Sequence, residues 1–444
     1  MTTTRRPRLT GAARSAAAVA AALVGLAPAA VLVAPDAAAA GIGAASGITH
    51  VWQIQLENES ESATYGCGSG APDPYLCGLK TGGVFLPDFY ATGHVSLDNY
   101  LAQAAGVPYN PSTASDCDTD YYDVQGAPDT AGIGTATGCV YPSSVQTIYD
   151  QLTGVGKTWQ GLMEDLGFTA TRETACGIPE TNGAPDDPAA VPPPADATNT
   201  ATAADQYAAR HNPFVYFHSL TDGGGCANVR PLGSPTDPLS GLQANLLNPP
   251  SLTYITPNVC DDGHDSPCAG PDLQDRLAGT PGAKGAGGLT SADRFLAAVV
   301  PAIEASPAYQ AGTGMIVITS DEGSTSDTSK CCGEVAPTGG GTVGAVLVSK
   351  ALPAGVSTVA YNHFSLLRSY EDLFGITSGG ADGKGHLLEA ATANSFGPDV
   401  YDAGAPPAST PEVPLPVLEA LPIAAVALGA GYLARRRARR AQRA

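Results

Sequence analysis

The chain has 444 residues, 43% of them hydrophobic, and a formal net charge of −20, so it is long enough for one large packed domain. Ten of the 22 basic residues, but one of the 42 acidic residues, lie in the terminal stretches 1–40 and 435–444, so the sequence between them is strongly acidic. This charge argues against nucleic acid or an anionic membrane surface as the main partner. An anionic substrate would need local positive charge, most simply a divalent metal ion.

Residues 1–40 have the three parts of a secretory signal peptide. The first 14 residues include four arginines, and a run rich in Ala, Val and Leu follows at 15–34. The small residues at 38–40 suit a cleavage site. The arginine pair at 5–6 could belong to a twin-arginine signal, but the residues after it fit poorly, so the general secretory route is favoured. We therefore expect an exported protein; a retained N-terminal membrane helix is the alternative.

Residues 41–402 are expected to form one domain. Apolar runs bounded by turn residues predict buried strands at 48–56, 214–218, 252–256, 315–319 and 343–348. Helical patterns lie between them at 100–105, 145–153, 291–303 and 365–374. This alternation predicts an α/β fold with a mostly parallel central sheet and helices on both faces. Two stretches rich in Asp, Ala, Thr and Pro are expected to be long surface loops, at 107–137 and 183–205.

Ten cysteines fit an exported protein, because oxidising compartments favour disulfides. Connectivity does not follow from sequence, but four local pairs are plausible: Cys67 with Cys77, Cys117 with Cys139, Cys176 with Cys226, and Cys260 with Cys268. The adjacent Cys331 and Cys332 can pair with each other only through a strained eight-membered ring, so outward pairing that rearranges the others is an alternative. A zinc cluster is disfavoured because no Cys-x-x-Cys spacing occurs.

The C-terminal end resembles a membrane anchor. Residues 403–414 are a Pro-rich linker, and 415–434 form a mostly apolar run that is just long enough to span a bilayer. The Arg-rich tail 435–444 should stay in the cytoplasm, which puts the domain on the extracellular face of a single-pass protein with its C-terminus inside. The alternatives are a buried core helix or a cleaved sorting signal, although no Leu-Pro-x-Thr-Gly motif is present.

Acidic residues follow two of the predicted strands. Glu57 and Asn58 come after the first strand, and Asp321 and Glu322 come after the strand at 315–319. Ligands of open α/β sheets bind beyond the carboxyl ends of the strands, and carboxylate and amide oxygens suit a divalent cation. The alternative is that these acids only end strands and cap helices.

Two further clusters carry polar groups suited to catalysis. Ser96 precedes a predicted helix, where the helix dipole and free N–H groups would favour a phosphoryl group and Asn99 could hold a phosphate oxygen. The alternative is that Ser96 is only a helix N-cap. Asp262 and His264 lie just after the strand at 252–256, and this mixture suits metal ligation or acid–base chemistry.

Together these segments resemble the bacterial phosphoesterase family of the alkaline phosphatase superfamily. That family includes secreted acid phosphatases, a phosphatidylinositol-3-phosphate phosphatase and phospholipases C that hydrolyse phosphatidylcholine. Seven pieces match in order over about 48–376: 56–60, 94–100, 156–159 with 163–165, 210–214, 257–258 with 262–265, 321–323, and 363–368 with 371–375. The piece at 94–100 is similar to the family's His-Pro-Ser-x-x-Asn-Tyr, with Val95 and Asp98 in place of prolines.

The resemblance implies an alkaline-phosphatase-like fold and a role for each matching residue. Ser96 would be the nucleophile, and one or two divalent metal ions would be bound by Glu57, Asn58, Asp262, Asp321 and Glu322. Two sets of residues would contact the substrate. The phosphoryl group would be contacted, or the leaving oxygen protonated, by His211, His264 and His363. Substrate would also be bound by His94 and Asn99.

The sequence therefore predicts an exported, membrane-anchored, metal-dependent phosphomonoesterase, similar to acid phosphatases, that forms a phosphoserine intermediate. A phospholipase C-type phosphodiesterase is the alternative within enzymes. A catalytically inactive cell-surface protein on the same fold is the alternative from another class. The presence of Glu57, Ser96, His264 and Asp321 weighs against the inactive protein, because a decayed site usually loses some of these groups.

Overall fold

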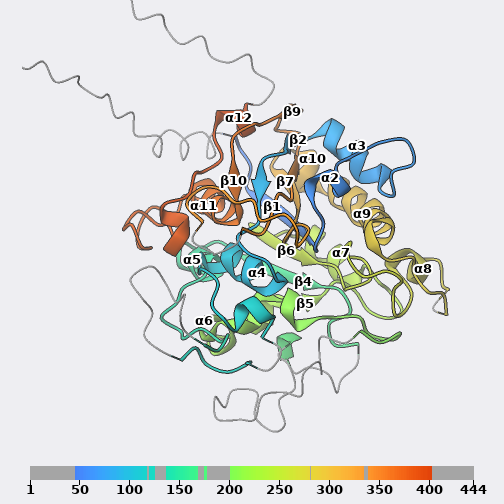
Figure 1. The fold of residues 1–444 in the computed structure, drawn as a ribbon, viewed down its shortest axis with the longest axis horizontal. Coiled ribbons are helices and arrows are strands. Elements are labelled where there is room, and N and C mark those ends of the chain that lie inside the picture. The colour runs from blue at the N-terminus through green and yellow to red at the C-terminus, as the bar shows by residue number, and fades with distance from the viewer. Residues whose placement is uncertain are drawn as a thin grey trace, which may run out of the picture.

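The structure is a computed structural model, and it describes residues 46–117, 120–125, 137–168, 175–177, 201–280, 282–334 and 339–402 (Figure 1). The predicted signal peptide, Pro-rich linker, apolar anchor and Arg-rich tail all lie outside these residues, as do parts of the two predicted loops. Within the described part of the chain, no helix combines the length and the apolar character needed to cross a membrane.

An eight-stranded sheet forms the centre of the domain. Its order is β5-β4-β6-β1-β7-β8-β2-β9, and only β8 runs against both of its neighbours among these strands. The mostly parallel sheet is thus confirmed. The strands are β1 (His50–Leu56), β2 (Val84–Leu86), β4 (Trp159–Met163), β5 (Val229–Pro231), β6 (Leu252–Thr256), β7 (Gly314–Ser320), β8 (Ala345–Val348) and β9 (Gly355–Val356), and a separate pair is β3 (Phe89–Tyr90) with β10 (Tyr361–Asn362).

Helices cover both faces of this sheet, as predicted (Figure 1). Alternate residues of β1 enter different cores: Val51 packs in the core of one face and Trp52 in the core of the other. The first face carries α4 (Ser96–Ala105), α5 (Ile148–Gly154) and α11 (His363–Leu373), and the second carries α3 (Pro74–Gly82), α7 (Ser240–Leu247), α9 (Gly288–Glu304) and α10 (Pro307–Gln310). The four predicted helices correspond to α4, α5, α9 and α11.

The other helices are short. They are α2 (Glu61–Thr64), α6 (His218–Thr221), α8 (Leu273–Leu277) and α12 (Pro398–Tyr401), with single 3-10 turns at η1 (Thr113–Ser115), η2 (Ala175–Gly177), η3 (Ala209–His211), η4 (Pro213–Tyr216), η5 (Gly225–Asn228) and η6 (Leu388–Ala391).

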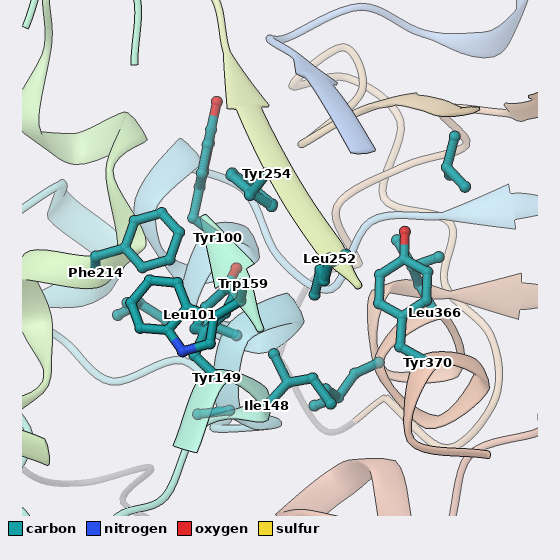
Figure 2. Packing of buried hydrophobic residues seen from close by; sticks show 14 of the residues in the cluster. Tyr100, Leu101, Ile148, Tyr149, Trp159, Phe214, Leu252, Tyr254, Leu366 and Tyr370 are labelled. Atoms are coloured by element: carbon teal, nitrogen blue, oxygen red, sulfur yellow. The ribbon is translucent and has the colours of Figure 1, made fainter. Parts of the chain in front are cut away.

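The strand predicted at 214–218 is wrong. These residues form η4 and the start of α6, because Pro213 begins the turn and the Asn212 side chain accepts a hydrogen bond from the Phe214 N–H at 3.2 Å. The adjacent β4 was missed, although it pairs with both β5 and β6. Figure 2 shows the contact between η4 and β4: Phe214 and Trp159 lie face to face, with ring centroids 5.3 Å apart. Gly161 makes this contact possible, since a Cβ there would lie 2.4 Å from the Phe214 ring.

All ten cysteines form disulfides. The four predicted local pairs are confirmed, and Cys331 and Cys332 pair with each other rather than outward. No rearrangement of the predicted pairs is therefore needed.

Buried polar contacts fix α4 against the centre of the sheet. Gln53 of β1 donates a hydrogen bond to Gln103 of α4, and both side chains are buried. At the same, C-terminal, end of the helix, Gly106 adopts the left-handed conformation at φ 70° and its N–H bonds the Ala102 carbonyl. These contacts set the height of α4, so that its first residue, Ser96, lies near the carboxyl end of β1.

A largely buried arginine ties the loop after β6 to the end of β4. The Arg276 guanidinium contacts the carboxylates of Glu164 and Asp165 and lies 3.5 Å from Asp261. Glu164 also accepts a hydrogen bond from the Asn258 N–H at 3.0 Å, and all three carboxylates are buried. This network anchors the start of the loop that continues to Asp262.

Replacing Arg276 with methionine should destabilise the fold strongly. The buried carboxylates would lose their cationic partner, which typically costs about 3–5 kcal/mol of unfolding free energy. Urea denaturation of the two proteins measures this difference. The matched control is Arg230→Met, the same change at an exposed position of β5, for which about 0.5 kcal/mol or less is expected. Equal midpoints for the Arg276 and Arg230 variants would contradict the anchor.

Candidate active site

Three carboxylates meet beyond the carboxyl ends of adjacent strands. Glu57 directly follows β1, Asp321 directly follows β7, and Asp262 lies in the loop after β6. Backbone hydrogen bonds hold these segments together: the Asp321 N–H donates to the Leu56 carbonyl at 3.0 Å, and the Glu57 N–H donates to the Asp262 carbonyl at 2.8 Å. The site therefore lies where α/β sheets bind their ligands.

Ser96 is the first residue of α4, and its hydroxyl points at this cluster. The side chain is buried, and Oγ donates a hydrogen bond to Glu57 Oε1 at 3.0 Å. The N-cap position belongs to Val95, and the Leu97 N–H is bonded at 3.0 Å by the carboxylate of Asp116. The Ser96 hydroxyl thus does not cap the helix, so the alternative that Ser96 is only a helix N-cap is wrong.

The backbone just before Ser96 is strained. Val95 has φ 88° and ψ 132°, a conformation that β-branched residues rarely adopt. Its N–H donates to Glu322 Oε2 at 3.1 Å, which helps to hold this conformation. Proline, with φ fixed near about −65°, could not take it.

His211 of η3 provides a nitrogen beside the carboxylates. Its ring stacks on Tyr100 with centroids 5.2 Å apart, and Nε2 lies 3.2 Å from Glu57 Oε1. The other nitrogen, Nδ1, is 3.7 Å from Asp262 Oδ2. Burial lowers the pKa of His211, which favours the neutral imidazole that metals bind.

Glu57, His211 and Asp321 can hold a metal ion together, since one ligand atom of each lies within 4.8 Å of the others. Asp262 Oδ2 and Asp321 Oδ2 are buried oxygens without a hydrogen-bond partner. Unpaired buried carboxylate oxygens are costly unless a cation neutralises them. Oxygen and imidazole ligands suit divalent cations such as zinc or manganese, so these residues fit the predicted metal.

The shifted pKa values of these carboxylates also favour a bound cation. Burial and then the neighbouring Glu57 charge raise the pKa of Asp321 and of Asp262 well above the usual range. Burial also disfavours the Glu57 anion, but His211, His264 and Arg210 outweigh it and hold its pKa well below the usual range. A bound divalent cation would let all three carboxylates ionise.

Two of the predicted metal ligands lie beside this triad. Glu322 Oε2 is 2.7 Å from His94 Nδ1 and accepts from the Val95 N–H, while His94 Nε2 is 2.8 Å from the Asp327 carbonyl. Asn58 donates its backbone N–H to Asp321 Oδ1 at 2.7 Å. In this arrangement Glu322 and His94 fix the turn before Ser96, and Asn58 orients a carboxylate of the triad.

His264 is the exposed histidine of the site. Its side chain is 45% exposed, and Nδ1 lies 3.3 Å from Glu57 Oε2. The hydrogen bond to Glu57 raises the pKa of His264 and outweighs the opposing effect of burial. A protonated imidazole at the mouth of the site is suited to donate a proton to a leaving group.

Two predicted substrate-contacting residues are instead turned inward. His363 is fully buried, its Nε2 donates to the Asp321 carbonyl at 2.6 Å, and burial lowers its pKa to about 4. The Asn99 side chain is also fully buried: its oxygen accepts from Thr92 and Gly93, and its nitrogen donates to the carbonyls of Gly93 and Val95. Both residues support the loops of the site from behind.

Arg210 and Asp116 are functional candidates that received no role from the sequence. Arg210 Nη2 lies 3.8 Å from Glu57 Oε1, and Arg210 Nε lies 3.9 Å from Asp116 Oδ2. Arg210 directly precedes His211 in the segment 210–214, which we compared with the phosphoesterase family, so the sequence did point to this residue. Asp116 lies in a stretch that we interpreted as a surface loop, and the sequence carries no signal for it.

No family model matches the chain. It is 25% identical over 196 residues, 44% of its length, to a phosphate-repressible acid phosphatase of Penicillium chrysogenum. It is also 25% identical over 216 residues, 48% of its length, to an acid phosphatase of Aspergillus fumigatus. Each match covers 36% of the fungal protein, so the chain spans about a third of the length of the curated relatives it matches.

Among solved structures, the chain is similar to a protein in the alkaline phosphatase superfamily from Vibrio parahaemolyticus. The TM-score is 0.38 at 11% identity, with 76% of this chain and 74% of the other covered.

Removing the metal or one of its ligands should impair the site. Asp321→Asn removes a buried charge from the triad, so weaker metal retention and a loss of hydrolysis of about a hundredfold or more are expected. Elemental analysis after desalting measures the retained metal, and a phosphatase assay measures the rate. Asp237→Asn, the same change at an exposed turn, is the control that should retain both. Full activity in a preparation that contains no metal would contradict the prediction.

Proposed function

We propose that this chain is a metal-dependent phosphomonoesterase that works through a phosphoserine intermediate at Ser96. The observation that carries the proposal is the hydrogen bond of the buried Ser96 hydroxyl to Glu57, inside a cluster in which Asp262 Oδ2 and Asp321 Oδ2 lack hydrogen-bond partners. Two fungal relatives that are named acid phosphatases support the same reaction class. We also propose that the chain is a member of the bacterial phosphoesterase family, on the basis of the seven matching segments in its sequence.

In the first step, Ser96 Oγ attacks phosphorus and the bond to the leaving oxygen breaks. The hydroxyl proton leaves along the hydrogen bond to Glu57 Oε1. A divalent cation held by Glu57, His211 and Asp321 would lower the pKa of the hydroxyl and stabilise negative charge on the phosphoryl oxygens.

His264 then protonates the leaving oxygen. Its exposed position and raised pKa suit that role, because the leaving group must depart towards solvent. In the second step the neutral His264 accepts a proton from water, the water oxygen bonds to phosphorus, and Ser96 leaves and regains its proton from Glu57. The two steps return every group to its starting state.

We also propose that the enzyme works on the extracellular face of the cell membrane. The basis is the sequence alone: an export signal at 1–40, and an apolar run at 415–434 followed by the Arg-rich tail.

Ser96→Ala is the decisive test of the mechanism. Turnover of p-nitrophenyl phosphate should fall by about a thousandfold or more, because the variant lacks the nucleophile, while folding is preserved. Acid-quenched wild-type enzyme should carry phosphate on the peptide that contains Ser96. Ser60→Ala is the matched control: Ser60 caps α2 by accepting from the Ala63 N–H, so that change should cost about 1 kcal/mol of stability and spare turnover. A folded Ser96→Ala protein with near-normal turnover would rule the mechanism out.

Protease accessibility tests the proposed topology. Protease added to intact cells should digest the domain at 41–402 and leave an epitope tag after residue 444 protected, since the arginines keep the tail inside. Permeabilised cells, in which the tag should be lost, provide the control. Digestion of the tag in intact cells would reverse the orientation.

A further inference from the structure

A second buried cluster of charges lies at the C-terminal end of α11, away from the candidate active site. His386, in the segment 376–391 that follows α11, is 4% exposed and lies between two carboxylates. Its Nδ1 lies 2.6 Å from Asp382 Oδ2, and its Nε2 lies 3.0 Å from Asp372 Oδ1. Asp372 belongs to α11 and Asp382 to the same segment as His386. The imidazole ring therefore joins the segment to the helix.

This geometry requires a proton on both ring nitrogens of His386. Ionised carboxylate oxygens only accept hydrogen bonds, so a neutral imidazole would turn a lone pair towards one of them. Asp382 also accepts at Oδ1 from the backbone N–H groups of Lys384, at 2.7 Å, and His386, at 3.3 Å. Burial disfavours the Asp382 anion, but its hydrogen bonds outweigh this effect and lower its pKa. The contact with Asp382 is therefore an ion pair with the imidazolium.

The groups around His386 favour its charged form on balance. They are Arg368, Glu371 and Asp372 of α11, Asp382 and Lys384 of its own segment, and Tyr401 of α12 beside Asp372. Burial opposes the charge on His386, but the hydrogen bonds to Asp372 and Asp382 outweigh it and raise the pKa of the ring. The Arg368 charge acts against this rise without reversing it.

A second contact between α11 and the segment depends on protonation in the same direction. Glu371 Oε1 accepts from the Leu387 N–H at 2.8 Å, while Oε2 is buried without a hydrogen-bond partner. Burial raises the pKa of Glu371 to about 8, so the folded chain keeps this carboxyl protonated where an unfolded chain would ionise it. Both His386 and Glu371 thus bind a proton more tightly in the folded chain, which makes the attachment strongest at acid pH.

The segment 376–391 supports the two helices that reach the active site. The Glu389 N–H donates to the carbonyl of Gly106, which follows the last residue of α4, at 3.1 Å. α4 begins at Ser96, and α11 begins at His363, which bonds the Asp321 carbonyl. A weaker attachment of the segment would therefore loosen the packing behind both helices.

We propose that His386 is a pH-dependent switch: its imidazolium attaches the segment 376–391 to α11, and loss of its proton at alkaline pH weakens the attachment. The stability that His386 contributes is fully present below about pH 6.5, the ordinary pKa of histidine, and is lost as the pH rises through the higher pKa of the folded chain. Glu371 adds a loss between its ordinary value of 4.5 and about 8.

Hydrogen–deuterium exchange of the full chain tests this switch. After correction for the intrinsic effect of pH on exchange, protection of the amides in 376–391 should fall by about tenfold or more between about pH 6 and about pH 9. In His386→Gln the protection should already be low at about pH 6 and should change much less with pH. The amides of the central strand β7 provide the internal reference, which should stay protected.

Two further variants separate the charge of His386 from other effects of pH. Asp382→Asn keeps an oxygen that can accept from the ring but removes its charge, so the fall in protection should move to lower pH by about one unit. Glu371→Gln should remove the fall below about pH 6.5 and keep the part above it. Should His386→Gln fail to fold, the wild-type pH series and Asp382→Asn still decide the matter.

His218→Gln is the matched control. His218 of α6 also lies between two carboxylates, 2.8 Å from Asp123 and 3.0 Å from Asp222. It makes no contact with α11, so its replacement should leave the pH dependence of 376–391 as in the wild type.

The inference is overturned by protection of 376–391 that does not change with pH in the wild type, by wild-type pH dependence in His386→Gln, or by an unmoved transition in Asp382→Asn. These measurements do not use enzymatic activity. A chain that hydrolyses no phosphate ester would refute the proposed function and leave the switch intact.

Discussion

The carboxylate of Glu57 is the contact point on which the rest of the site depends. The Ser96 hydroxyl, His211 Nε2 and Arg210 Nη2 all approach its Oε1, and His264 Nδ1 approaches its Oε2. These groups come from α4, η3 and the loop after β6, so a single buried anion organises three separate segments of the chain. The anion itself is fixed because it directly follows β1, the strand between β6 and β7. The sheet therefore sets the geometry of the chemistry through one side chain.

The segments around Glu57 are held by contacts that themselves take no part in the proposed reaction. Gln53 and Gln103 fix α4 against β1, and Arg276 anchors the loop that leads to Asp262. Glu322 bonds the N–H of Val95 and so helps to hold a backbone conformation that would otherwise be unfavourable. This local strain directs the first turn of α4 so that Ser96 points at Glu57 instead of capping its own helix. The stability of the surrounding sheet offsets the free-energy cost of the strained Val95 backbone.

Sequence reasoning predicted the parts of this arrangement that depend on strand order and local spacing. The buried strands β1, β6 and β7 and the acids that follow them were predictable, because each leaves a pattern within a few residues. The four disulfides were predictable because each joins two cysteines that follow one another in the order of cysteines along the chain. The direction of a side chain leaves no such pattern. Asn99 satisfies backbone groups although the same residue could have held phosphate, and Asp116 reaches Leu97 from a stretch that looks like an ordinary loop. The turn at Pro213 was mistaken for a strand because burial on all sides gives both structures the same apolar run.

The balance of charge explains why such an acidic site can still accept an anion. Burying Glu57, Asp262 and Asp321 together with unpaired oxygens disfavours folding, so any cation that binds them also stabilises the folded chain. The same cation offsets part of the negative charge that a phosphate ester would meet.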